Sequence, residues 1–313
     1  MTDTATLVRR DARRTKVRRS DLRAVRAQER AAWVLSAPFL LILVVFSLVP
    51  LAMALVVSLT DTQASDLRSL GAVNFVALES YSKVMSDPAF QGAMLNTGVM
   101  TVIGVPLTVG AGMLLALALN TGIQRLRATY RAAFYLPVVT NIVAAAVIWQ
   151  YAFTIDGPVN SALAVFGLGN VNWLGSPSTA TGLVIVLASW RNVGTAMILF
   201  LAGLQAIPQE TYEAAAMDGA GFWRNLWSIT MPLLRPTMLL ASVLITITYL
   251  NIFDEPFLLT RGGPTGSTRT VGLWVYEQFG FGNISNAMAG SFLLIAFVAL
   301  ISVVQVRMLR SKT

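Results

Sequence analysis

Six long runs of apolar residues dominate the chain, and the shorter segments between them hold most of the charge. Each run has about twenty residues or more, the length at which a helix crosses a hydrocarbon core of roughly 30 Å. The apolar residues follow one another without the alternation of a membrane β-strand, and a helix satisfies its own backbone groups in lipid. The pattern therefore predicts an all-α membrane protein whose six transmembrane helices occupy residues 33–59, 95–119, 132–153, 181–205, 237–258 and 285–306.

The composition supports a membrane domain without a large soluble domain. Of the 313 residues, 55% are hydrophobic and 12% are charged, and the mean hydropathy is +0.66. Soluble chains carry about 25% charged residues. We expect three parts: a basic N-terminal tail at 1–32, a six-helix membrane domain at 33–306, and a short basic C-terminus at 307–313.

The basic residues predict the orientation of the chain. The net charge is +8, and ten of the 23 Lys and Arg lie within residues 1–32. A nucleic-acid-binding tail is one explanation, but we favour an inward-facing terminus because cytoplasmic segments of membrane proteins are rich in Lys and Arg. With the N-terminus inside, eighteen basic residues fall in inner segments and four in outer loops. We therefore expect both termini in the cytoplasm and no nucleic-acid partner.

Small residues in the second apolar run predict a closely packed bundle. Small side chains let the backbones of two membrane helices approach each other. The residues concerned are Gly98, Gly104, Gly110, Gly112 and Ala116.

Residue types that are absent exclude several kinds of chemistry. The chain has no histidine and no cysteine, which excludes a disulfide framework, thiolate and histidine catalysis, and the usual zinc ligand sets. It also lacks the nucleotide-binding pattern G-x-x-x-x-G-K-[ST]. We expect no catalytic residue, no metal site and no bound cofactor in this chain, and we find no support for an intramembrane enzyme.

The inner segment 206–236 is predicted to form a helical hairpin. Pro208 suits the first turn of a helix, Glu213 places negative charge near its positive end, and Asp218-Gly219 is a stop signal. A second, amphipathic piece follows. A helix in the lipid interface would account for its tryptophans, but not for three alanines followed by Asp-Gly. The apolar face of the second piece comprises Phe222, Trp223, Leu226, Trp227 and Ile229.

This segment carries a resemblance to a known family. Glu213-Ala214-Ala215, with Gly219 four positions after the last alanine, is similar to the EAA loop of permease subunits of binding-protein-dependent ABC importers. Other stretches resemble the carbohydrate-importer branch, of the maltose and glycerol-phosphate type, and the GGP…ST segment at 262–268 is typical of the first of two permease subunits. The stretches are FVALESYSKVMSDPAFQGAMLNT at 75–97, NWLGSP at 172–177, SWRNVG at 189–194, FLAGLQAIPQETYEAA at 200–215 and FDEPFLLTRGGPTGSTRT at 253–270.

The resemblance implies a type I ABC importer permease fold and a set of partners. These are a homologous second permease, two ATPase subunits that bind ATP and Mg, and an extracytoplasmic solute-binding protein. It also implies a multi-pass location in the bacterial inner (cytoplasmic) membrane, among its lipids, and a carbohydrate as substrate: a di- or oligosaccharide, a polyol or glycerol phosphate. The Ala- and Arg-rich composition, typical of a high-GC genome, adds the trehalose or maltose type as one candidate. In that family the EAA loop docks into the ATPase, so the implied coupling residues are Glu213, Ala214, Ala215, Asp218 and Gly219.

Polar residues inside the apolar runs are candidates for the substrate path, because they are costly in lipid and usually face a cavity. Trp149, Trp190, Tyr249 and Phe253 could present faces to sugar rings. A structural role is also open: Arg191 could pair with Asp254 or Glu255 and hold helices together, and we favour this role for the ion pair. The candidate path residues are Asn141, Gln150, Arg191, Asn192, Asn251, Asp254 and Glu255.

An ATP-independent secondary transporter or channel is the alternative. Such proteins often contain internal repeats and membrane carboxylates that bind coupling ions. We find no internal repeat, and the candidate carboxylates, Asp254 and Glu255, lie near one face of the membrane. Dependence on ATP and a co-purifying ATPase would separate the two hypotheses.

Overall fold

The computed structural model describes residues 19–66, 73–121 and 126–310. Within them it contains helices and one isolated β-bridge, between Thr60 and Phe75, and no strand. The prediction of an all-α protein is thereby confirmed. The chain divides into two compact units, one that ends at Val56 and one that begins at Val57.

The first unit is built on one long helical segment. It consists of α2 (Arg19–Leu43), a π-helical turn η1 (Val44–Leu48), and α3 (Val49–Ser58), which runs into the second unit. Residues 32–58 are apolar enough to span a membrane, which confirms the first expected span. The π-helical turn ends two residues before Pro50, which has no N–H to donate to the carbonyl of Phe46 within the turn.

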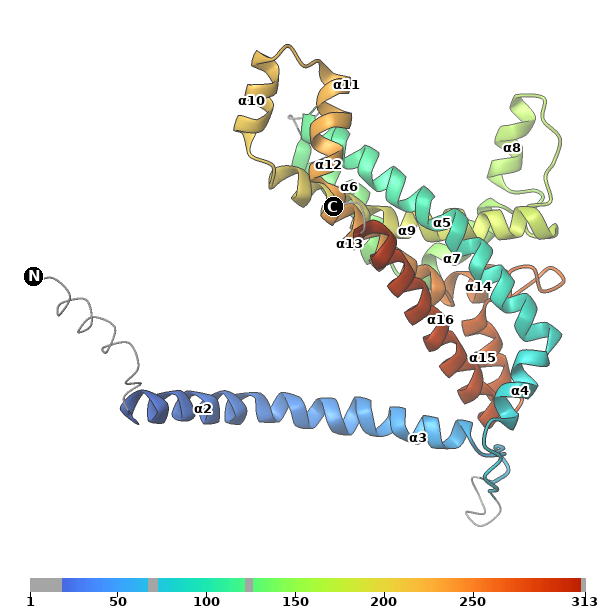
Figure 1. Cartoon of the computed structure of the whole chain (residues 1–313). Coiled ribbons are helices and arrows are strands. Elements are labelled where there is room, and N and C mark those ends of the chain that lie inside the picture. The colour runs from blue at the N-terminus through green and yellow to red at the C-terminus, as the bar shows by residue number, and fades with distance from the viewer. Residues whose placement is uncertain (1–18, 67–72, 122–125, 311–313) are drawn as a thin grey trace, which may run out of the picture. The chain divides into compact units, whose positions relative to one another are not determined.

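The second unit is a bundle whose longest helices are α5 (Pro88–Thr121), α9 (Pro177–Gln205) and α16 (Ile284–Arg310). Each contains a stretch long and apolar enough to span a membrane, which confirms the second, fourth and sixth expected spans. Helix α5 packs along α9, and α13 (Arg235–Leu250) contacts α5, α9 and α16. Figure 1 shows α10 (Gln209–Met217) at one end of this bundle and α4 (Glu79–Ser86) at the other.

The third expected span, 132–153, is not one continuous helix. Helices α6 (Arg127–Val139) and α7 (Ile142–Ala152) meet at 94°. Pro137 precedes the break, and the side chain of Asn141 accepts hydrogen bonds from the amides of Val143 (2.9 Å) and Ala144 (3.4 Å). Asn141 therefore serves as the N-cap of a new helix, which relieves backbone donors that lipid could not satisfy.

The fifth expected span, 237–258, is also broken. Helix α13 ends at Leu250, and a short helix, α14 (Asp254–Leu259), follows. Pro256 cannot donate to the carbonyl of Ile252, and that carbonyl accepts a hydrogen bond from the Thr270 hydroxyl at 2.8 Å instead. Before α13, residues 222–233 form a helical segment bent by 65° from it. Counting each bent pair as one crossing, the described residues contain up to six spans.

The remaining helices complete the second unit. They are α8 (Pro158–Val165), α11 (Phe222–Asn225), the π-helical η3 (Leu226–Thr230), α12 (Met231–Leu233) and α15 (Val271–Gly280).

Small residues set the spacing between α5 and its neighbours. A methyl group added at Gly112 would lie 2.5 Å from the Cβ of Ala196 on α9, and one at Gly104 would lie 2.1 Å from the Tyr249 ring on α13. Ala116 is fully buried. By contrast, a methyl group at Gly98 or Gly110 would meet nothing within 4 Å. The expected close packing is confirmed for three of the five small residues and is wrong for Gly98 and Gly110.

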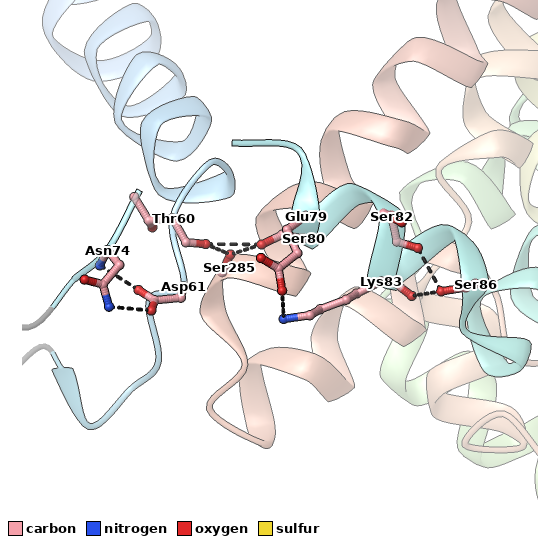
Figure 2. A network of polar contacts seen from close by, with 9 residues as sticks. All are labelled: Thr60, Asp61, Asn74, Glu79, Ser80, Ser82, Lys83, Ser86 and Ser285. Carbon is pink, nitrogen blue, oxygen red and sulfur yellow. Dashed lines mark hydrogen bonds and ion pairs between the residues drawn. The ribbon is translucent and has the colours of Figure 1, made fainter. Parts of the chain in front are cut away.

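A polar network fastens the segment after α3 to α4 and to the start of α16 (Figure 2). The Ser80 and Ser285 hydroxyls lie 2.8 Å apart, and both donate to the carbonyl of Thr60. The backbone N–H of Ser285 donates to the carbonyl of Thr62 at 3.0 Å. These buried contacts join residues more than two hundred positions apart in the sequence, so they define the end of the bundle at which α16 begins.

The neighbouring Asp61 carboxylate is held in its charged form. It accepts hydrogen bonds from the side chain and the backbone N–H of Asn74, at 3.0 and 2.8 Å. These two bonds lower the pKa of Asp61 below its ordinary value. The contact therefore stabilises the fold above the ordinary carboxyl pKa and is lost as the pH falls through the lowered value.

The packing of α5 predicts different outcomes for two chemically identical substitutions. Gly112→Ala places a methyl group 2.5 Å from Ala196, whereas Gly110→Ala places one in open space. Both substitutions raise the helix propensity of α5 by the same amount. We expect Gly112→Ala to be less stable by about 1–3 kcal/mol, the usual cost of overpacking, as measured by thermal unfolding in detergent. Equal melting temperatures for the two variants would contradict the close contact of α5 with α9.

Candidate functional site

A cavity of about 420 Å³ lies where α6, α9, α13 and α14 meet. The break between α13 and α14 forms one of its walls, because residues 251–253 turn there instead of continuing the helix. Five of the seven candidate path residues line it: Arg191, Asn192, Asn251, Asp254 and Glu255.

An ion pair connects two walls of the cavity. The Nη1 atom of Arg191 on α9 lies 3.0 Å from Oε1 of Glu255 and 3.7 Å from Oδ2 of Asp254, both on α14. The Glu255 side chain is only 6% exposed, whereas that of Asp254 is 49% exposed. The pairing considered from the sequence is therefore present, mainly with Glu255. Arg191 holds α14 against α9 and is at the same time part of the cavity wall.

The polar side chains of the remaining wall are uncharged. Asn192 and Asn251 each donate a hydrogen bond to a backbone carbonyl one turn earlier in the chain, at 2.9 and 2.8 Å. Thr248 also lines the cavity, although it was not among the candidates. Its position three residues before Asn251, the C-cap residue of α13, places it one helical turn earlier and is the sequence signal that could have identified it. The amides and this hydroxyl suit the hydroxyl groups of a polar solute.

Asn141 and Gln150 are not among the residues that line this cavity. Asn141 caps α7, as described above. The Nε2 atom of Gln150 donates to the carbonyls of Leu258 (2.7 Å) and Leu259 (3.1 Å), at the end of α14. Both side chains satisfy backbone groups where helices begin or end.

The four aromatic residues proposed as sugar faces have different surroundings. Tyr249 and Phe253 line the cavity. Tyr249 is nevertheless fully buried, with its hydroxyl 2.8 Å from Ser189 and 3.1 Å from Thr108. Trp149 packs beside Trp190, with ring centres 5.8 Å apart. Only Phe253 therefore combines a place at the cavity with partial exposure.

The segment 206–236 forms the expected hairpin. Helix α10 begins after Pro208 and ends at Met217, and Gly219 adopts a φ of +75°. The amides of Gly219 and Ala220 donate to the carbonyls of Ala216 (3.0 Å) and Ala215 (2.9 Å). This is a Schellman C-cap, which requires a left-handed residue at the position of the glycine. The stop signal at Asp218-Gly219 is confirmed.

The second arm of the hairpin returns through α11, η3 and α12. The hydroxyls of Tyr212 and Thr230 lie 3.1 Å apart and connect the two arms. Phe222, Trp223 and Trp227 are exposed, whereas Leu226 and Ile229 are half-buried, so the expected apolar face is only partly covered within this chain.

The five candidate coupling residues surround the end of α10. Glu213, Ala214, Asp218 and Gly219 are exposed, and Glu213 accepts a hydrogen bond from Gln209 at 3.0 Å. Ala215 is buried, and its carbonyl belongs to the C-cap. Four of these residues therefore lie on the surface of the second unit, and Ala215 shapes the turn behind them.

Comparisons with known proteins connect this architecture to one family. Residues 104–310, more than half of the chain, match the model for the binding-protein-dependent transport system inner membrane component. The lactose transport system permease protein of Rhizobium radiobacter is 34% identical over 279 residues, covering 87% of this chain and 92% of that protein. The trehalose/maltose transport system permease protein of Thermococcus litoralis is 31% identical over 281 residues, covering 90% and 94%.

The fold is also that of a solved transporter. A chain of a bacterial alginate ABC transporter, crystallised with an alginate pentasaccharide-bound periplasmic protein, superposes with a TM-score of 0.79. The two chains share 21% identity, and the match covers 92% of this chain and 96% of that one.

The ion pair in the cavity predicts that a second substitution restores the stability lost by a first one. Arg191→Met leaves the buried Glu255 carboxylate without its closest cation, which we expect to destabilise the protein by roughly 3 kcal/mol. Adding Glu255→Met removes the unpaired charge and should restore most of the stability. Thermal unfolding in detergent measures both. If the single variant melts at the wild-type temperature, the pair does not hold α14 in place.

The C-cap of α10 predicts a contrast between two neighbouring glycines. Gly219 has a φ of +75° and Gly221 a φ of −77°, and neither would gain a steric clash from an added methyl group. Gly219→Ala should cost about 1–2 kcal/mol because of its left-handed backbone, and Gly221→Ala should cost little. Amide hydrogen exchange over residues 209–217 should accelerate on the order of fivefold or more in the first variant only. The same exchange rate in both would rule out the cap as the cause of the turn.

Proposed function

The chain belongs to the family of binding-protein-dependent transport system inner membrane components, and from that membership we propose that it forms the sugar-translocation path of an ABC importer together with a homologous second permease. As a membrane permease it is a transport subunit and not a catalytic one. The observation that carries the proposal is the polar cavity at the break between α13 and α14, in a bundle with the fold of an importer permease.

A carbohydrate is the substrate class that best fits the relatives and the cavity. The similar permeases are named for lactose and for trehalose and maltose. The cavity offers amide groups of Asn192 and Asn251, the Thr248 hydroxyl and the half-buried ring of Phe253. Such a combination of hydrogen-bonding groups and an aromatic surface suits a di- or oligosaccharide, including one of the trehalose or maltose type.

The hairpin of 206–236 is the proposed point of coupling to one of the two ATPase subunits. Glu213, Ala214, Asp218 and Gly219 form its exposed contact surface, with Ala215 behind them. ATP and Mg belong to those partners, since this sequence lacks a phosphate-binding loop. Closure of the ATPases on ATP would move the hairpin and favour one of two cavity orientations, as required when a nucleotide drives a two-state change.

The proposed topology places the hairpin and both termini in the cytoplasm of a bacterial cell. Residues 1–32 then form a basic inner tail, 33–306 the membrane domain in the inner (cytoplasmic) membrane, and 307–313 a short basic inner end. The solute-binding protein would deliver its sugar at the opposite end of the bundle, where α4 lies (Figure 1).

An ATP-independent transporter fits the cavity less well. A coupling cation would need a carboxylate that can release its present partner. Glu255 is buried and lies 3.0 Å from Arg191, which leaves Asp254 as the exposed carboxylate of the cavity.

Purification of the complex from its native cell in mild detergent tests the proposal. We expect a second permease and an ATPase to co-purify, and sugar uptake into proteoliposomes to require ATP. Isolation of this chain alone, with uptake that follows an ion gradient and ignores ATP, would replace the importer with the secondary transporter.

The coupling role of the hairpin predicts a specific loss in the same complex. Glu213→Ala removes an exposed carboxylate from the docking surface, and loss of a charge-assisted contact should lower the sugar-stimulated ATPase rate about tenfold. Glu29→Ala is a matched control, because Glu29 is also an exposed glutamate on a helix but belongs to α2, outside both the hairpin and α4. An equal effect of both substitutions would contradict docking through the hairpin.

A further inference from the structure

We propose that the cavity between α9 and the α13–α14 break accepts an uncharged sugar and repels anionic ones, such as uronates, sugar phosphates or sulfonated sugars. The proposal rests on the proposed function, because it specifies the class of carbohydrate that the same cavity would admit. It concerns the wall that this chain contributes.

The charges that line the cavity do not balance. Its lining contains one cation, Arg191, and two carboxylates, Asp254 and Glu255, which leaves a formal charge of −1. All other lining residues are uncharged: Val138, Ala188, Asn192, Thr248, Tyr249, Asn251, Ile252 and Phe253. An anionic solute that enters therefore meets a wall of its own sign, in surroundings where a nearby membrane weakens the screening by water.

The single cation of the lining, Arg191, is already paired with carboxylates of this chain. Arg191 contacts Glu255 at 3.0 Å and Asp254 at 3.7 Å through the same nitrogen atom. If an anion drew the guanidinium away, the Glu255 carboxylate, only 6% exposed, would remain buried without its cation. Stripping a buried charge of its partner is strongly unfavourable. Arg191 can give its remaining N–H groups to sugar hydroxyls without this loss.

The other positive feature of the cavity is neutralised as well. The N-terminus of α14 begins with Asp254 and Glu255, so its own carboxylates occupy the end of the helix that would attract an anion. Asp254 is 49% exposed, which places negative charge at the surface of the cavity and not behind it. What remains for a solute are amides and a hydroxyl, which bind neutral hydroxyl groups.

The fold alone does not decide this selectivity. A solved transporter with the same fold, at a TM-score of 0.75 and 22% identity, imports alginate, an acidic polysaccharide. The helix arrangement is therefore compatible with acidic solutes, and the proposed exclusion of anions depends on the side chains that line this cavity.

The absence of cysteine from the chain allows a direct test on the assembled complex. Asn251→Cys introduces the only thiol of this chain into the cavity wall, and Thr248→Cys provides a second position if the first variant does not assemble. The thiol is modified with two methanethiosulfonate reagents of similar size, one carrying a sulfonate and one a trimethylammonium group. The rate at which each reagent modifies the thiol is measured from the increase in mass of this chain over time.

A control thiol corrects for the intrinsic reactivity of the two reagents. Ser178→Cys lies in a groove between α5 and α9 whose lining contains no charged side chain. Relative to that control, we expect the cavity thiol to favour the cationic reagent about tenfold or more. Adding Asp254→Asn brings the lining to a formal charge of zero and should return the ratio to the control value.

Two results would overturn the proposal: a ratio equal to that of the control, or a preference for the anionic reagent. Either would show that the assembled cavity does not repel anions, for example because the second permease contributes cations. Neither result affects the proposed importer function, which depends on ATP-driven uptake. Conversely, the cavity thiol could react faster with the cationic reagent and lose this preference in the Asp254→Asn variant. That result would support a negatively charged cavity even if uptake proved independent of ATP.

Discussion

The structure depends on one constraint: inside a lipid bilayer, every backbone group at a helix break needs a partner from the protein itself. Two breaks in the second unit meet this requirement with side chains. The side chain of Asn141 accepts hydrogen bonds from the backbone amides at the start of α7. The Thr270 hydroxyl donates a hydrogen bond to the carbonyl of Ile252, to which Pro256 cannot donate. Because the second break is satisfied, α13 can end inside the bundle and turn, and this turn forms one wall of the polar cavity.

The hairpin and the cavity are connected through two continuous helices. Helix α9 carries Arg191 and leads directly into the hairpin, and α13 leaves the hairpin and ends at the cavity. The two helices also pack closely, since a methyl group on Gly203 would lie 2.5 Å from the Thr237 hydroxyl. A displacement of the hairpin would thus reach both walls of the cavity along rigid elements, which is the mechanical basis of the proposed coupling.

The sequence was sufficient to predict the helices that cross without interruption, because hydropathy reports length and apolarity. It was not sufficient for the third and fifth spans, because the length and apolarity of a run do not show whether the prolines and polar residues within it break the helix. Such residues are Pro137 and Asn141 in the third span and Asn251, Asp254 and Pro256 in the fifth. The end of α10 could be predicted because Asp218-Gly219 is a local signal. The roles of Asn141 and Gln150 could not, because a polar side chain in an apolar run shows that it needs a partner but not which one it has.

The most direct test of the account is whether ATP changes access to the cavity. In sealed proteoliposomes containing the complex, a membrane-impermeant thiol reagent is applied to the Asn251→Cys variant with and without ATP trapped by vanadate. We expect the labelling rate of this single thiol to change several-fold with the nucleotide state, because closure of the ATPases would reorient the walls formed by α9 and α13. A labelling rate that ignores ATP and follows an ion gradient instead would contradict the coupling between hairpin and cavity.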